Sequence, residues 1–400
     1  MKKNLVIIIL AAFCMVFVSC SKKEEPVKEE VKQEEVKKEE VKKDYVVGAF
    51  FAITGKFASL LGEPERNTVE MMVKQVNEAG GINGHKLVVH MEDTQGDNSR
   101  AVKAAKKFIG MGVCAIVGPS RSGSSMAVIP VVQKAKIPLI SCAAAESIVV
   151  PVAERKYIFK TPQKDSDAVR KIYGRLNKKG VTDVGIITGT TGFGNAGRGQ
   201  LKTLAGEYKI NIVADETYSP ADTDMTAQLV KIKNAGAKAV INWSIVPAQS
   251  IVPKNMKQLK MDIPLYQSHG FGNIKYAKLA GDAAEGIMFP GGRLLVAKQL
   301  IHHHPQRPLL MKYKEDYEST YNEDASTFGG HAYDALLIVI NALKAVGDDP
   351  EKIRDHIETQ NFFGTGGNFK FTPEDHNGLN TRAFDMITVS FGEFKILGEW

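Results

Sequence analysis

The chain has 400 residues, of which 44% are hydrophobic and 24% are charged, and its formal net charge is +7 at pH 7. This length and apolar content suffice for two globular domains. The positive charge is not gathered into a basic tract with interleaved aromatic residues, so we expect no nucleic-acid partner.

The first 44 residues predict a leader and a tether. Two lysines precede an apolar run over residues 5–18, which is too short to span a membrane and is typical of a signal peptide, here residues 1–19. The run ends in FVSC, which resembles a bacterial lipobox and predicts lipidation of Cys20. Residues 20–44 are rich in Lys and Glu and lack aromatic residues and glycine, which favours a solvated tether. We therefore expect a periplasmic or extracytoplasmic lipoprotein held at a membrane.

Apolar runs alternate with amphipathic stretches from residue 45 onward. The first series predicts strands at 46–53, 87–90, 115–117 and 138–141, with helices at 65–78 and 99–109 and a third helix that follows the 120–125 loop and ends near residue 135. Strands joined by a helical crossover must run parallel. This series therefore predicts a first doubly wound lobe.

The stretch from residue 115 to residue 145 carries the predicted binding site. Its two strands are followed by small-residue segments at 120–125 and 142–145. Ligands of parallel sheets sit beyond the carboxyl ends of the strands, so both segments are expected at one ligand-binding edge. Ser122, Gly123 and Ser124 open a helix there, and helix N-termini favour anions such as a carboxylate. No catalytic group is evident, which favours a binding protein over an enzyme.

A second series predicts another lobe. It has strands at 184–188, 212–214, 239–243 and 263–267, and helices at 165–178, 197–208, 225–234 and 248–260. Helices at 308–321, 331–346 and 350–359 are assigned back to the first lobe. The expected organisation is first lobe at 45–160, second lobe at 161–291, return to the first lobe at 292–362, and completion of the second lobe and hinge at 363–400. The fold class is α/β, with two doubly wound lobes joined by a hinge of several strands.

Cysteine and histidine patterns argue against a disulfide and a metal site. Cys114 and Cys142 are expected at opposite ends of neighbouring parallel strands, roughly 10 Å apart, which predicts two buried free thiols. Three consecutive histidines, His302 to His304, cannot converge on one metal ion, and a solvated loop is expected.

Ten phrases spread over residues 45–400 carry a family resemblance. They include VVGAFFAITGKFASLLGEP, VNEAGGINGHKLVVHMEDTQGD, AIVGPSRSGSSMAV, IPLISCAAA, GFGNAGRGQLK, DTDMTAQLVKIK and FGGHAYDALL. In this order they resemble the leucine/isoleucine/valine-binding proteins of branched-chain amino acid ABC importers. The resemblance implies a periplasmic binding protein of type I: a monomer without cofactor or enzymatic activity that closes on a small ligand and presents it to a membrane permease.

The resemblance also implies a set of site residues. Ser122 falls on the serine that holds the ligand carboxylate, and Ala143 on the residue whose carbonyl receives the amino group. Three positions depart from the family pattern, which has Thr or Ser at Ala145, Tyr at Phe193, and an acidic residue before glycine at His269. The predicted ligand-binding residues are Leu61, Ser122, Gly123, Ser124, Ala143, Ala144, Ala145, Phe193, Trp243, His269, Gly270 and Phe328.

Two ligand classes stay open at this point. The family favours a branched-chain amino acid. Without the acidic residue replaced by His269, however, a buried α-ammonium would lack its counter-charge. An aromatic or other amine-free carboxylate is the alternative, with Phe193, Trp243 and Phe328 as walls. Arg121 is predicted to be an exposed loop residue; the alternative is that its charge helps to bind an anionic ligand. A sensor that reports ligand to a receptor shares the fold and is a further alternative.

One motif favours a different function. Residues 192–197, GFGNAG, fit G-x-G-x-x-G after a predicted strand, and Asp215 follows near the end of the next strand. This pattern resembles a dinucleotide-binding fingerprint and would indicate an NAD-dependent enzyme. The glycines begin several residues past the strand, and an exported protein meets little nicotinamide cofactor, so this is the distant alternative.

Overall fold

The computed structural model describes residues 43–55 and 59–398. The predicted signal peptide, the lipidation of Cys20 and nearly all of the predicted tether lie outside the described residues and stay predictions. In the part of the chain that the structure describes, no helix is long and apolar enough to cross a membrane.

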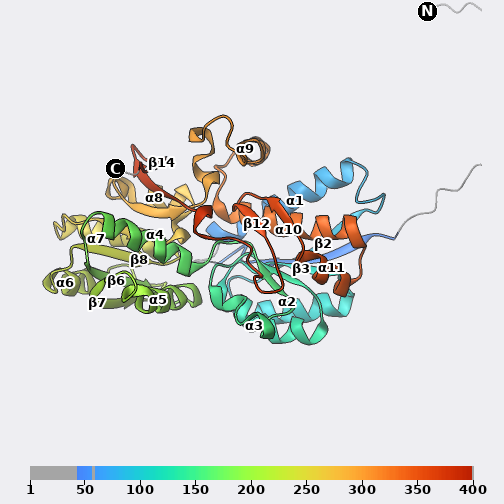
Figure 1. The fold of residues 1–400 in the computed structure, drawn as a ribbon, viewed down its shortest axis with the longest axis horizontal. Helices are drawn as coiled ribbons and strands as arrows, with labels where there is room; N and C mark the ends of the chain where they lie inside the picture. The colour runs from blue at the N-terminus through green and yellow to red at the C-terminus, as the bar shows by residue number, and fades with distance from the viewer. Residues whose placement is uncertain (1–42, 56–58, 399–400) are drawn as a thin grey trace, which may run out of the picture. The chain divides into compact units, whose positions relative to one another are not determined.

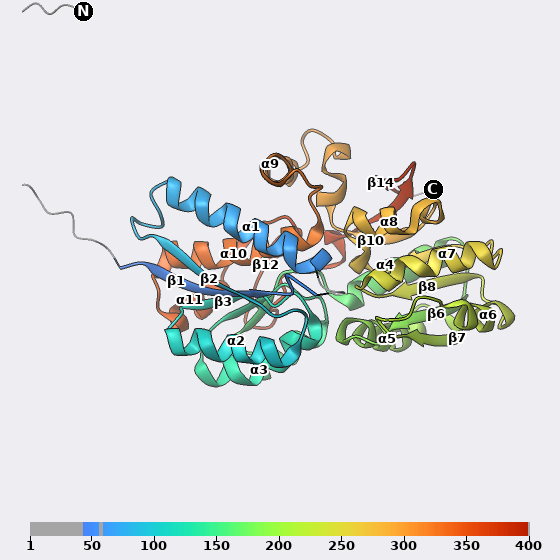
Figure 2. The same cartoon turned by 180° about the vertical axis from the view of Figure 1, so that it is seen from behind.

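The first lobe is built on a parallel sheet with the strand order β2-β1-β3-β4-β5. Helices cover both faces: α1 packs with α10 on one side and α2 with α3 on the other (Figures 1 and 2). The strands are β1 (Tyr45–Phe51), β2 (Leu87–Asp93), β3 (Ala115–Val117), β4 (Leu139–Ser141) and β5 (Ile158–Lys160). The helices are α1 (Ser59–Glu78), α2 (Asn98–Met111), α3 (Ser122–Ala135), α10 (Thr327–Val346) and α11 (Pro350–Ile357).

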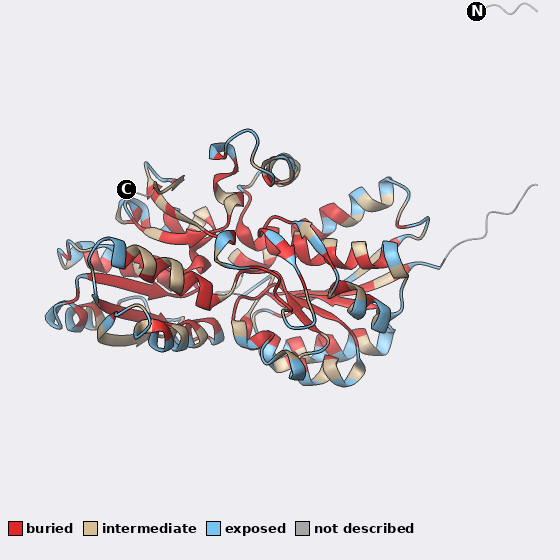
Figure 3. Cartoon of the chain, in the orientation of Figure 1, coloured by how far each residue is buried: buried red, intermediate tan, exposed pale blue. Residues whose placement is uncertain are grey.

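The second lobe is built on a seven-stranded sheet with the order β14-β13-β10-β9-β8-β6-β7. Strands β6 to β10 run parallel, whereas β13 pairs antiparallel with β10 and β14. The strands are β6 (Asp183–Gly189), β7 (Asn211–Tyr218), β8 (Ala239–Trp243), β9 (Leu265–Gln267), β10 (Met288–Gly291), β13 (Asp385–Ser390) and β14 (Glu393–Ile396). The helices are α4 (Asp165–Lys178), α5 (Gly192–Ala205), α6 (Thr226–Asn234), α7 (Ile251–Gln258) and α8 (Ile274–Ala280). The two central sheets are buried between their helices (Figure 3).

Several segments connect the lobes, and one buried carboxyl organises them. Helix α9 (Arg307–Tyr321) and the hairpin of β11 (Asn361–Phe363) and β12 (Asn368–Lys370) lie in the sequence between β10 and β13 of the second sheet. Asp334 of α10 accepts hydrogen bonds from the Thr365 N–H at 2.6 Å, the Thr365 hydroxyl at 2.9 Å and the Gly366 N–H at 2.7 Å. Gln163, on the first crossing, donates to the Gly366 carbonyl at 2.8 Å. The β11–β12 loop is thereby held to both α10 and the first crossing.

Helix α10 begins four residues earlier than the sequence pattern predicts, at Thr327, and helices α1 and α5 begin six and five residues earlier. Helix α1 includes Pro64, which lacks the N–H that would bond the Leu60 carbonyl. That carbonyl instead accepts a hydrogen bond from Asn273 of the second lobe at 3.2 Å. Helix α5 begins at Gly192 because the Thr191 hydroxyl caps it, accepting from the Gly194 N–H at 3.1 Å. In both cases a tertiary contact or a cap outweighs the helix-breaking residues nearby.

Two smaller expectations can be compared with the structure. Cys114 and Cys142 are free and buried, as predicted. The three histidines lie in the irregular segment between residues 299 and 307, where His304 Nδ1 accepts from the Gln306 N–H at 3.2 Å.

Candidate ligand-binding site

The turn after β3 brings the two small-residue segments together. Gly118 has φ +96°, and a Cβ there would lie 2.3 Å from the Phe50 carbonyl oxygen, so glycine is required. The chain then enters α3 at Ser122, whose hydroxyl accepts a hydrogen bond from the Ala145 N–H at 3.3 Å. The segments after β3 and β4 therefore lie side by side, as parallel strands require.

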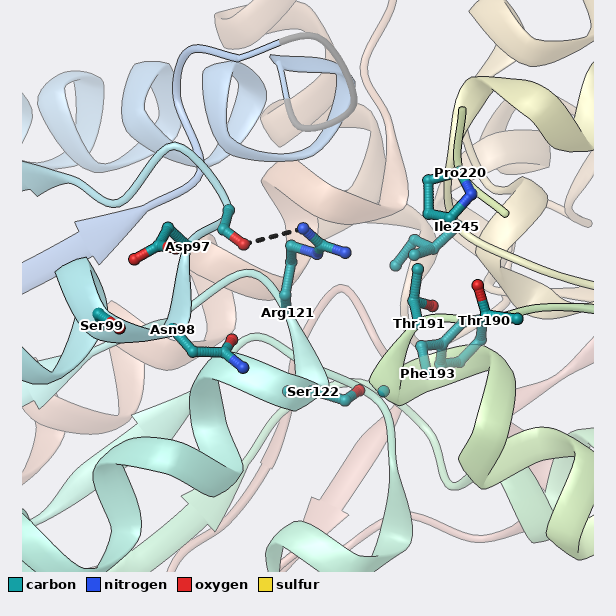
Figure 4. Close-up of a pocket in the computed structure, with 13 residues that line it drawn as sticks. Asp97, Asn98, Ser99, Arg121, Ser122, Thr190, Thr191, Phe193, Pro220 and Ile245 are labelled. Carbon is teal, nitrogen blue, oxygen red and sulfur yellow. Dashed lines mark hydrogen bonds between the residues drawn. The ribbon is translucent and has the colours of Figure 1, made fainter. Parts of the chain in front are cut away.

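A cavity of about 490 Å³ opens at the carboxyl ends of the strands of both sheets (Figure 4). The first lobe lines it with residues 96–99 and 121–123, and the second lobe with residues 190–193, Pro220 and Ile245. The N-termini of α2, α3 and α5 all border it. Helix N-termini present free N–H groups and the positive ends of their dipoles, so this arrangement favours a negatively charged ligand.

The glycines of the G-x-G-x-x-G motif serve packing. A Cβ on Gly192 would lie 2.7 Å from the Gly123 nitrogen, so this glycine lets the two lobes meet. A Cβ on Gly194 would lie 1.7 Å from the Gly189 carbonyl oxygen, and one on Gly197 would lie 2.1 Å from Nε1 of Trp243. At each of these positions a side chain would clash with another part of the protein. Packing therefore accounts for the three glycines without a bound dinucleotide.

Arg121 is a charged side chain in this cavity, and it is half-buried. Its Nη1 donates to the Gly96 carbonyl at 2.9 Å. Figure 4 shows the guanidinium in the gap between the loop that carries Gly96 and the side chains of Thr191 and Ile245. Burial lowers the pKa of the guanidinium from its usual value, and arginine nevertheless stays charged.

An aromatic cluster lies behind the cavity in the second lobe. Phe193 lines the cavity, and its ring lies 5.8 Å from Trp243 and 5.2 Å from His269, centroid to centroid. His269 also contacts Phe384 edge to face at 5.5 Å. Neither ring nitrogen of His269, nor the Trp243 indole nitrogen, has a hydrogen-bond partner among residues 43–55 and 59–398. Burial holds the pKa of His269 well below its usual range, so the ring is neutral at physiological pH.

The charged group that acts most on this histidine is a buried lysine. Lys160 ends β5, has no exposed surface, and donates from Nζ to the Pro162 carbonyl. Burial lowers its pKa to about 7 and raises that of the nearby Asp165 carboxyl to about 6, while the attraction between the two opposes both shifts. Burial is the main cause that lowers the pKa of His331 and of His269; the Lys160 charge lowers both further, and His331 adds to the effect on His269. His269, in place of an acidic residue, thus faces basic neighbours.

Comparison with known protein families matches residues 44–391 to the family described as periplasmic binding protein. The chain belongs to the periplasmic binding protein family. It is 24% identical over 344 residues to the leucine-, isoleucine-, valine-, threonine- and alanine-binding protein of Pseudomonas aeruginosa, covering 85% of this chain and 87% of the relative. A Leu/Ile/Val-binding protein homolog of Brucella melitensis biotype 1 is 23% identical over 364 residues, covering 89% and 93%.

Solved structures agree with this assignment. An extracellular ligand-binding receptor from Rhodopseudomonas palustris HaA2 superposes with a TM-score of 0.83 at 25% identity, covering 88% of this chain and 99% of the receptor. The branched-chain amino acid binding protein LivJ of Streptococcus pneumoniae, in complex with isoleucine, has a TM-score of 0.76 at 24% identity, covering 88% and 99%. The predicted family and the type I fold are confirmed, and this periplasmic binding protein is a ligand-binding protein that acts outside the cytoplasm.

The predicted site residues of this periplasmic binding protein fall into two groups: those that line the cavity and those that are buried behind them. Ser122, Gly123 and Phe193 line the cavity. The other nine are buried around it and do not line it. Leu61, Ala144 and Phe328 pack into the same apolar cluster as Phe193, Trp243 and the second-lobe core. Ala143 and Ala145 pack in the first lobe, the Ser124 hydroxyl donates to Asn98, and Gly270 lies against the Phe193 ring.

Sequence reasoning missed part of the cavity wall. Residues 96–99, Thr190, Thr191, Pro220 and Ile245 were not predicted, and Arg121, read as an exposed loop residue, is half-buried in the cavity. The missed residues lie just beyond the carboxyl ends of β2, β6, β7 and β8. The rule that ligands bind at that edge of a parallel sheet applies to all these strands, and it could have found them.

Proposed function

We propose that this periplasmic binding protein binds a small carboxylate that lacks an α-ammonium group, in the cavity between its lobes. One observation carries the proposal. Among the lining residues the acidic side chain is Asp97, which caps α2 by accepting from the Arg100 N–H at 2.8 Å and points away from Arg121 in Figure 4. A buried ammonium would therefore lie beside a guanidinium and three helix N-termini without a free counter-charge, at a cost of several kcal/mol.

The carboxylate is assigned to the start of α3. Ser122 and Gly123 line the cavity at the first turn of this helix, where backbone N–H groups lack intrahelical partners and the helix dipole favours an anion. Phe193, Pro220 and Ile245 give the rest of the ligand an apolar wall, which suits an aliphatic or aromatic body.

The wider role follows from the family. Relatives are named for binding leucine, isoleucine and valine, and LivJ is a transporter substrate-binding protein. We propose that the chain, anchored by a lipid on Cys20, delivers its ligand to an ABC permease. Stimulation of the ATPase of a permease complex by the ligand-loaded protein tests this role, and coupling to a receptor instead would indicate a sensor.

A branched-chain amino acid is the second candidate ligand, because the relatives carry that name. Leucine and 4-methylpentanoate share a carbon skeleton and differ by the amine, so they form a matched pair. The purified full chain is unfolded and refolded to strip bound ligand, and its melting temperature is then followed with each compound and with benzoate. A shift with 4-methylpentanoate or benzoate and none with leucine supports the proposal; the reverse shows an amino acid binder.

Ser122→Ala tests the carboxylate position. The variant removes one hydroxyl that also receives the Ala145 N–H, and we expect every carboxylate to bind about tenfold more weakly. Unchanged affinity by titration calorimetry would exclude Ser122 as the carboxylate ligand.

A further inference from the structure

Arg121 is a guanidinium without an acidic partner. No ion pair to it within 4.0 Å occurs in the described part of the chain. Some other partly buried arginines are paired: Arg198 binds Asp215 through Nε at 2.7 Å and Nη2 at 2.9 Å, and Arg293 binds Asp385 through Nε at 2.9 Å. Arg175 and Arg307 are also partly buried without an ion pair in the described part of the chain, but neither lines this cavity. A partly desolvated charge with no counter-charge is costly, so a partner from outside the chain is expected at Arg121.

The geometry directs this side chain into the cavity. Arg121 stands at the residue before α3 in an extended conformation, with φ −117° and ψ 139°. The bond from Nη1 to the Gly96 carbonyl fixes the guanidinium plane against the β2–α2 loop. A guanidinium carries five N–H donors, so one such bond leaves donors on the side that faces the second lobe (Figure 4).

From this geometry we propose that Arg121 binds a second carboxylate of the ligand, so that the protein takes up a short dicarboxylate. This inference rests on the proposed function, in which Ser122 and the start of α3 hold the first carboxylate. Both anchors belong to consecutive residues that border one cavity of about 490 Å³. Phe193 and Ile245, on the opposite wall, would cover the carbon chain between the two acid groups. Planar bidentate pairing with carboxylate is the interaction for which arginine is best suited.

The test compares acids that differ only in the second carboxylate. Butanoate is paired with butanedioate and hexanoate with hexanedioate, and each is titrated calorimetrically into the stripped full chain. We expect a dicarboxylate to bind at least about tenfold more tightly than its monocarboxylate partner. Arg121→Gln is expected to abolish that difference and to leave monocarboxylate affinity within about threefold. Arg121→Lys, which keeps the charge and loses the planar fork, is expected to give an intermediate preference.

Arg100→Gln is the matched control. Arg100 lies in the first turn of α2, and its side chain is exposed outside the cavity. It is expected to leave both affinities unchanged. If the wild-type chain binds the two acids of each pair with equal affinity, the inference is overturned, and this result does not depend on whether Arg121→Gln folds. An Arg121→Gln variant that weakens both acids alike also overturns it. If amino acids bind and neither acid of any pair does, the proposed function itself has failed.

Discussion

Replacing Gly197 by alanine tests the packing that supports the second-lobe side of the site. A Cβ at this position would lie 2.1, 2.2 and 2.3 Å from three atoms of the Trp243 indole. Ordinary carbon contacts are about 3.5–4.0 Å, so the ring must move by more than an ångström. Trp243 has no exposed surface, and the Phe193 and His269 rings lie 5.8 and 5.7 Å from it.

The magnitude follows from two opposing terms. Overpacking of a rigid core costs about 1–3 kcal/mol, and the close overlap here places the cost at the upper end. Alanine in place of glycine within a helix returns about 1 kcal/mol. The expected net loss is about 2 kcal/mol of unfolding free energy, together with weaker ligand binding, because displacing Trp243 moves Phe193 at the cavity wall.

The same helix supplies the control. A Cβ on Gly199 would meet no atom within 4 Å, and the residue is exposed. Gly199→Ala is expected to stabilise the protein by up to about 1 kcal/mol. The assay is thermal unfolding followed by tryptophan fluorescence, with ligand titration on each variant. If Gly197→Ala melts as high as Gly199→Ala and binds ligand as the wild type does, the steric account of this glycine is wrong.

Three further predictions concern lobe contact, pH and the hinge. Gly192→Ala places a methyl 2.7 Å from the Gly123 nitrogen, so it is expected to hold the lobes apart and weaken ligand binding about tenfold; Gly206→Ala, at the C-cap of α5 with no atom within 4 Å, should not. Burial lowers the pKa of His331 from 6.5 to about 3, so between these values the unfolded chain binds more protons, and stability present above pH 6.5 is lost as the pH falls. From pH 8 to pH 5 this costs about 2 kcal/mol, which His331→Asn is expected to recover in denaturation curves at the two pH values. Asp334→Asn replaces one carboxyl oxygen by an NH₂, which then faces either the Thr365 N–H or the Gly366 N–H as donor against donor. The variant should lower the unfolding free energy by about 1–3 kcal/mol; a melting temperature equal to that of the wild type would show that the loop does not depend on this residue.

Local sequence patterns were sufficient to predict the fold. Alternating apolar runs and amphipathic helices identify parallel strands with helical crossovers, and parallel strands bring their carboxyl ends to one edge regardless of the details of packing. For the same reason Ser122 and Gly123 could be placed at the cavity, and Cys114 and Cys142 could be assigned as unbridged thiols.

The direction of the strands locates the ligand-binding edge, but it does not predict which residues at that edge face the ligand. Trp243 ends β8 and His269 follows β9, close to the same edge as Ile245, yet both rings are packed behind Phe193. Gly197 leaves room for the Trp243 indole inside the lobe. The start of α5 was misjudged because glycine lowers helix propensity, whereas the Thr191 cap and close packing favour the helix.

The sequence by itself determined that this chain folds as two doubly wound lobes, because hydrophobic periodicity and strand polarity are properties of each segment. The family was indicated separately, by the resemblance of its sequence phrases. Only the tertiary structure decided which charged groups and helix N-termini meet at the site. The approach of Gly123 to Gly192 brings the helix N-termini of both lobes to one cavity, and the Gly96 carbonyl fixes Arg121 there without an acidic partner in the described chain. Electrostatics depends on distances between segments far apart in sequence, and those distances exist only once the lobes have packed.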